Sequence, residues 1–232
     1  MKKEIPSKIG SSRPIEIGFF VAGCLFAFLL LVEFLFERLA SLHFLAQVFL
    51  VLAACASFYT AAYLYADRTA ELQRLRRAQI LILVVFILCL ADITLIGSSV
   101  GRLHFPGTRE DYLELFVNFH PFRTICNYLR GFLNGYLALW RLVLNLLGNF
   151  FLLSPFALIL PILFRYERKW YVFLPTVLTV SFSVEALQYL FMAGSCDVDD
   201  LILNFLGATA VFFFLKIPPL RRLIRIITKS GF

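Results

Sequence analysis

The 232-residue chain is 60% hydrophobic and 16% charged, with 27 Phe residues and a mean hydropathy of +0.83. A soluble domain of this size could not bury so much apolar surface, so the composition indicates a polytopic helical membrane protein. The apolar runs are continuous and do not alternate with period two, which excludes a transmembrane β-barrel. The net charge of +7 is typical of basic loops that set membrane orientation, so no nucleic-acid partner is expected.

The apolar runs predict an all-α bundle of about six membrane spans. The predicted spans cover residues 15–36, 43–66, 78–97, 136–164, 170–192 and 198–216. Pro155 and Pro161 predict a kink in the fourth span. The long connection at 98–134 interleaves Tyr, Phe, His and Arg, which predicts an interfacial or re-entrant outer segment.

Three parts of the chain follow from these spans. Residues 1–77 hold a tail, two spans and a basic connector, residues 78–216 form a four-helix membrane core, and residues 217–232 form a basic amphipathic tail. With six spans both termini lie on one side, and most of the 22 Lys and Arg residues fall on that side. Both termini are therefore expected in the cytoplasm, where the basic face should contact anionic lipid.

Polar and ionisable residues, which cost free energy inside a membrane, recur at one predicted depth near the outer face of the core. Arg141, Asn145 and Asn149 are spaced four apart and share one helix face, where Gly148 should let another backbone approach. Ionisable groups inside spans usually face a partner or a cavity, which predicts a polar pocket. The predicted pocket contains Asp92, His120, Arg123, Arg141, Asn145, Asn149, Glu185, Gln188, Asp197, Asp199, Asp200 and Asn204.

Structural roles for the same residues stay open. Asp197 and Asp200 have the spacing of a helix N-cap and its N3 partner, and Arg141 could form a purely structural ion pair with Glu185 or an Asp. No metal site is predicted, but the carboxylates leave a divalent cation open. Cys126 and Cys196 are both expected on the outer side, which leaves a disulfide open.

Four stretches carry a family resemblance. They are NFHPFRTI at 118–125, NLLGNFFLLSPFALILP at 145–161, SVEALQ at 183–188 and CDVDDLILNFLGA at 196–208. In their residues, order and spacing they resemble VanZ-like membrane proteins over roughly residues 80–215. The resemblance implies a bacterial cytoplasmic-membrane protein associated with low-level resistance to the glycopeptide teicoplanin. No cofactor is predicted.

Three hypotheses of function remain. In the leading one, the outer-leaflet pocket binds an envelope lipid or a lipid-linked head group, with Arg141, Arg123 and His120 attracting a phosphate or carboxylate. The second is an intramembrane enzyme acting on a lipid phosphate or a peptidoglycan precursor, with Glu185 or Asp200 as its catalytic candidate. The sequence contains no recognised catalytic motif, which favours a non-enzymatic role. The third is a structural membrane scaffold whose polar core specifies helix packing.

Overall fold

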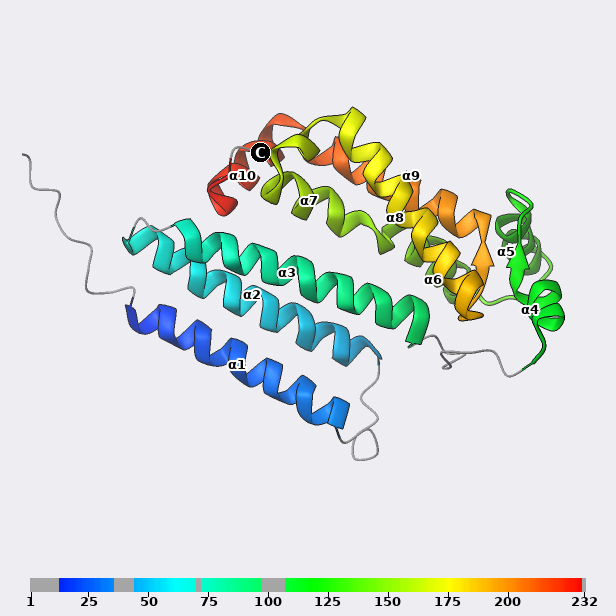
Figure 1. Ribbon diagram of the computed structural model, residues 1–232, viewed down its shortest axis with the longest axis horizontal. Helices are drawn as coiled ribbons and strands as arrows, with labels where there is room; N and C mark the ends of the chain where they lie inside the picture. Colours follow the sequence, from blue (N-terminus) through cyan, green and yellow to red (C-terminus); the bar gives the residue numbers. More distant parts are fainter. Residues whose placement is uncertain (1–12, 36–43, 70–71, 97–106, 231–232) are drawn as a thin grey trace, which may run out of the picture. The chain divides into compact units, whose positions relative to one another are not determined.

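The computed structural model describes residues 13–35, 44–69, 72–96 and 107–230, nearly all of them helical (Figure 1). Three predicted parts of the chain lie outside these residues: the N-terminal tail up to residue 12, the loop between the first two predicted spans and the start of the outer connection. The chain forms two compact units. The first is Met1–Leu83 with Ile227–Lys229, and the second is Val84–Ile226 with Ser230–Phe232.

The first unit is built on two long helices that pack side by side, α1 (Arg13–Leu35) and α2 (Phe44–Thr69) (Figure 1). The ring of Phe20 on α1 meets the ring of Phe58 on α2 edge to face, with centroids 5.8 Å apart. Gly23 lies against the same Phe58 ring. Helix α3 (Leu72–Ala91) begins in this unit, and its later residues belong to the second.

Residues Ile227–Lys229, near the end of the chain, also belong to the first unit. The Tyr59 hydroxyl donates a hydrogen bond to the Ile227 carbonyl at 3.0 Å, and Lys229 Nζ lies 3.0 Å from Asp67 Oδ1. These residues close α10 (Pro218–Thr228), the helix that follows the proline pair. Helix α10 lies within the predicted basic tail at 217–232.

The second unit holds the rest of the helices and two short strands. In chain order they are η1 (Asp92–Ile96, a π-helical turn), α4 (Arg109–Phe116), β1 (Val117–Asn118), α5 (Arg123–Leu133), α6 (Leu139–Leu152), α7 (Ser154–Leu163), η2 (Arg165–Arg168, a 3-10 turn), α8 (Trp170–Phe191), β2 (Cys196–Asp197) and α9 (Val198–Leu215). The predicted outer connection thus contains α4 and α5, which lie near the start of α9 (Figure 1).

Four helical stretches in the described residues are long and apolar enough to cross a membrane. They are Leu72–Leu95, Leu139–Leu163, Trp170–Phe191 and Val198–Leu215. The chain is therefore a membrane protein, as its composition predicts. The predicted kink in the fourth span is confirmed, because α6 and α7 are separate helices that meet at Leu153.

Helix α9 packs against α6, α7 and α8 and so forms the centre of the second unit. On its inner face Phe212 stacks on Phe173 of α8, with centroids 4.2 Å apart and both side chains fully buried. Gly207 lies against the backbone of Phe150 on α6, so closely that a Cβ there would lie 1.5 Å from the Phe150 carbonyl oxygen. The close approach predicted at Gly148 is wrong, because no heavy atom lies within 4 Å of a Cβ built there.

Candidate functional site

The turn between α8 and α9 is tied to the outer connection by a short parallel strand pair. In this pair Val117 lies opposite Cys196, and Asn118 lies opposite Asp197. The pairing brings the start of α5 onto the start of α9. It therefore places backbone N–H groups of one helix beside carboxylates of the other.

Asp199 fastens the two helix starts together. Its side chain is fully buried, and its carboxylate accepts hydrogen bonds from three backbone N–H groups at the start of α5. The donors are Phe122 N, Thr124 N at 2.7 Å and Ile125 N at 3.1 Å. The first N–H groups of a helix lack partners within the helix and carry partial positive charge, so a carboxylate suits them. Asp199 therefore acts as an N-terminal cap supplied by another helix.

Asp197 caps its own helix and also holds the outer connection. Its carboxylate accepts the backbone N–H of Asp199 at 2.8 Å, the Asn118 side-chain amide at 2.9 Å and the Thr124 hydroxyl. The predicted N-cap is therefore confirmed, since Asp197 precedes the first residue of α9. In a capping box the Asp200 side chain would accept the backbone N–H of Asp197. That N–H donates to Glu185 instead, and Asp200 contacts Asn149 on α6.

Glu185 on α8 and Asp200 on α9 are carboxylates that the caps do not use. Glu185 is 6% exposed and accepts the backbone N–H of Asp197 at 2.8 Å. Asp200 accepts the side-chain amide of Asn149 on α6. No described Lys or Arg forms an ion pair with either of them. Buried carboxylates usually have a cationic partner, so the absence of one here points to function.

Two amide oxygens near these carboxylates lack partners. Asn145 Oδ1 and Asn204 Oδ1 are buried, and no hydrogen-bond donor reaches either of them among the described residues. Asn145 lies one turn before Asn149 on α6, and Asn204 lies one turn after Asp200 on α9. Both oxygens are acceptors, so they add to a site that already consists mostly of acceptors.

These residues define the polar cluster, which consists of buried and half-buried polar side chains on α6, α8 and at the start of α9. Its members are Asn145, Asn149, Glu185, Asp197, Asp199, Asp200 and Asn204. Chemically the polar cluster presents oxygen acceptors with negative charge. It can receive groups that donate hydrogen bonds or carry positive charge.

Gln188 links the elements that surround the polar cluster. Its side-chain Nε2 donates to the Thr94 carbonyl in η1 at 3.1 Å, and its backbone carbonyl accepts the Tyr112 hydroxyl at 3.0 Å. Burial raises the pKa of Tyr112 to about 12, so this hydroxyl keeps its proton and remains a donor. Gln188 therefore joins α8 to η1 and α4, and no described hydrogen bond joins its side chain to the carboxylates.

The predicted cations lie outside the polar cluster. Arg141 is exposed, with its guanidinium 5.2 Å from the Trp140 ring centre, and it pairs with no described carboxylate. Arg123 and His120 are exposed beside the start of α5, and the His120 backbone N–H donates to Asn118. Asp92 is exposed as well. The structural ion pair of Arg141 with Glu185 or an Asp, considered above, is absent among the described residues.

Asn118 and Thr124 bind Asp197 but are missing from the predicted pocket. Both lie in the NFHPFRTI stretch, from which only the histidine and the arginine were selected. The signal that could have identified them is their place at the two ends of that stretch, on either side of a proline. Side chains there can bond to the backbone of a turn and to a neighbouring segment.

The described residues offer no group of metal ligands, and the two cysteines expected on the outer side are not bonded to each other. No three His, Cys, Asp or Glu side chains within the described ranges are grouped so that they could hold a metal ion. Cys126 and Cys196 are free thiols, the first exposed and the second buried. Burial raises the pKa of the Cys196 thiol to about 11, and the nearby Glu185 carboxylate contributes in the same direction.

Cys126 is expected to react with a maleimide at neutral pH while Cys196 stays unmodified until the protein is denatured. The reason is that Cys126 is exposed, whereas Cys196 is buried and its thiolate is scarce at this pH. Mass spectrometry of a variant in which Cys24, Cys55 and Cys89 are replaced by serine measures both sites. A disulfide would leave both cysteines unlabelled after denaturation without reductant, which would contradict this assignment.

Comparison with known proteins gives one family. The model of the VanZ/LLP1 family matches residues 81–219, which is more than half of the chain. The match covers α6 to α9 and so contains the entire polar cluster. No curated protein and no solved structure matches.

Proposed function

The chain belongs to the VanZ/LLP1 family, and we propose that it is a multi-pass protein of the bacterial cytoplasmic membrane that binds an envelope lipid or a lipid-linked head group at its polar cluster. In this proposal α1 and α2 also cross the membrane, which gives six spans. Both termini then lie in the cytoplasm, on the side that holds most of the basic residues. The polar cluster then faces the outer leaflet.

One observation carries the proposal: the buried Glu185 and the half-buried Asp200 have no described cationic partner, and two unpartnered amide oxygens lie beside them. Buried polar groups of this kind cost free energy unless something satisfies them. A scaffold would be more stable with apolar side chains at these positions. A ligand that supplies hydrogen-bond donors offsets the cost, which accounts for keeping these residues.

The chemistry of the polar cluster selects the part of the lipid that enters it. Because Glu185, Asp200, Asn145 and Asn204 present acceptors, the entering group carries hydroxyl, amide or ammonium donors. Sugars and peptides of lipid-linked envelope precursors carry such groups. The phosphate of the same lipid stays at the rim, where Arg123 and His120 are exposed near the start of α5. Occupation of the site changes the envelope so that teicoplanin acts less well.

Glu185→Gln and Asp200→Asn are each expected to return teicoplanin susceptibility to that of cells without the protein. Each change replaces a carboxyl group by an amide of the same size, so the loss of ligand binding exceeds the loss of packing. Inhibitory concentrations are measured at equal protein abundance in the membrane. Glu114→Gln, which neutralises an exposed carboxylate on α4, is the matched control and keeps protection.

Direct binding separates the three hypotheses. Native mass spectrometry of the purified protein with lipid II is expected to show a bound lipid that Glu185→Gln loses. Conversion of lipid II or undecaprenyl phosphate to a product would instead support the enzyme. If both variants protect cells as well as the unchanged protein does, the proposal is wrong. If they fail only because their abundance falls, the structural scaffold is the better account.

A further inference from the structure

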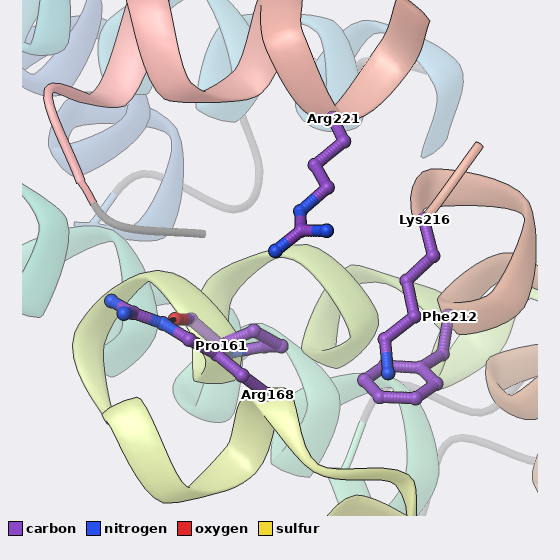
Figure 2. A pocket seen from close by; sticks show the side chains of 5 residues that line it. All are labelled: Pro161, Arg168, Phe212, Lys216 and Arg221. Carbon is purple, nitrogen blue, oxygen red and sulfur yellow. Dashed lines mark hydrogen bonds between the residues drawn. The ribbon is translucent and has the colours of Figure 1, made fainter. Parts of the chain in front are cut away.

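The second unit contains a cationic cavity far from the polar cluster. It has a volume of about 150 Å³ and is lined by Pro161, Arg168, Phe212, Lys216 and Arg221 (Figure 2). Lys216 follows the last residue of α9, whereas the carboxylates of the polar cluster lie at its first residues. An 18-residue helix is about 27 Å long, so the two sites lie about one hydrocarbon thickness apart.

Contacts with nearby residues position two of the cationic side chains of this cavity, Arg168 and Lys216. The η2 turn brings Arg168 back to the end of α7, where its Nε donates to the Pro161 carbonyl at 2.9 Å. Lys216 ends α9 with its Nζ 4.0 Å from the centre of the Phe212 ring. Figure 2 shows Arg221 and Lys216 extending from the chain after α9 toward the side where Pro161 and Arg168 lie. The basic side chains that line the cavity therefore come from three separate elements.

Two of the cations that line the cavity, Arg168 and Lys216, have no carboxylate partner in the described part of the chain. Burial lowers the pKa of Arg168, and the charges of Arg165, Arg225 and Arg221 lower it further. Burial and Arg221 lower the pKa of Lys216 in the same way. Both shifts come first from burial and then from neighbouring like charges, and a bound anion would oppose both effects.

The adjacent carboxylate does not supply that anion. Glu167 precedes Arg168 in the η2 turn, but it does not line the cavity and forms no ion pair with a described residue; its Oε1 accepts the Thr176 hydroxyl at 2.9 Å. The walls of the cavity are the Phe212 ring and Pro161, which add no negative charge. Its volume can hold a small anion, since one water occupies roughly 30 Å³ of liquid.

We propose that this cavity is a second binding site, one that takes a phosphate group at the end of the core opposite the polar cluster. Arginine and lysine are the side chains that bind phosphate, arginine through two parallel N–H groups and lysine as a point charge. With the orientation proposed above, the site faces the inner leaflet and the cytoplasm. The phosphate belongs to an anionic lipid head group or to a free phosphate ion, which share this chemistry.

Affinity measurements on the full-length protein test this site. Native mass spectrometry in detergent titrates phosphatidylglycerol, with phosphatidylcholine as the zwitterionic comparison, and calorimetry titrates inorganic phosphate. Arg168→Gln with Lys216→Gln is expected to weaken binding about a hundredfold, because each lost charge-assisted bond costs about tenfold. Binding of the lipid alone identifies a head-group site, and binding of inorganic phosphate with the same loss identifies a free-phosphate site.

A control pair of equal charge separates a built site from a basic surface. Lys169→Gln with Arg222→Gln removes two exposed cations that are neighbours of the cavity residues but do not line it. This pair is expected to change the affinity less than about threefold. An equal loss in both pairs, or no binding of either phosphate compound, would overturn the proposal. Lys216→Gln alone leaves the Arg168 bond to Pro161 intact and is expected to cost about tenfold, which tests the site without altering that turn.

Discussion

Asp199→Ala is expected to destabilise the core by at least about 3 kcal/mol and to release the start of α5 from α9. The substitution leaves three backbone N–H groups without their acceptor, and hydrogen bonds to a charged group contribute about 1.5–3 kcal/mol each. These contributions do not add fully, because the start of α5 can shift and find water. The effect should nevertheless be among the largest of any single polar substitution in the second unit.

Hydrogen exchange measures this effect at the residues concerned. The amides of Phe122, Thr124 and Ile125 are expected to exchange slowly in the unchanged protein and fast in the Asp199→Ala variant. Thermal unfolding in detergent should show a lower midpoint in parallel. Asp92→Ala, which removes an exposed carboxylate, is the control and is expected to leave both measurements unchanged. Unaltered exchange of the three amides in the Asp199 variant would disprove the capping role.

This role separates Asp199 from its neighbours in function. Because its carboxylate is occupied by the protein's own backbone, Asp199→Ala is expected to act through stability and abundance. Glu185 and Asp200 each show one described hydrogen bond and no ion pair with a described residue, so their conservative variants should lose function at normal abundance. The cluster of three aspartates therefore contains two kinds of residue, which the sequence alone treats alike.

The spans could be predicted because their boundaries are set by local chemistry. The fifth and sixth predicted spans, 170–192 and 198–216, agree with α8 and α9 to within one residue at each end. Charged residues and a short polar turn end the apolar runs there, and a membrane-length helix must satisfy its own backbone. The break between α6 and α7 could be predicted as well, because proline removes a backbone donor within the helix.

The contacts between helices could not be predicted in the same way. Helical spacing shows that Arg141, Asn145 and Asn149 share one face of their helix. It does not show which of the three a neighbouring helix covers. In the structure α9 reaches Asn149, while Arg141 near the start of α6 remains exposed. The capping of α5 by Asp199 depends on a strand pair of two residues on each side, which leaves no periodic signal.

Gly207→Ala is expected to separate α9 from α6 and to lower stability by about 1–3 kcal/mol, the usual range for overpacking. The added Cβ would lie 1.5 Å from the Phe150 carbonyl oxygen and 2.5 Å from its carbon, so backbone must move. Small residues let membrane helices approach closely, and this crossing also sets the distance between Asn149 and Asp200. The variant should therefore lose teicoplanin protection as well as stability.

Gly148→Ala is a matched control on the partner helix. It makes the same chemical change on α6, where the new methyl group meets no atom within 4 Å. Alanine favours a helix over glycine by about 0.5–1 kcal/mol, so this variant is expected to unfold at the same temperature or slightly higher. Thermal unfolding of the two variants in one detergent decides the matter. Equal midpoints would mean that α6 and α9 cross elsewhere, whereas a loss confined to Gly207→Ala ties the geometry of the polar cluster to this one close contact.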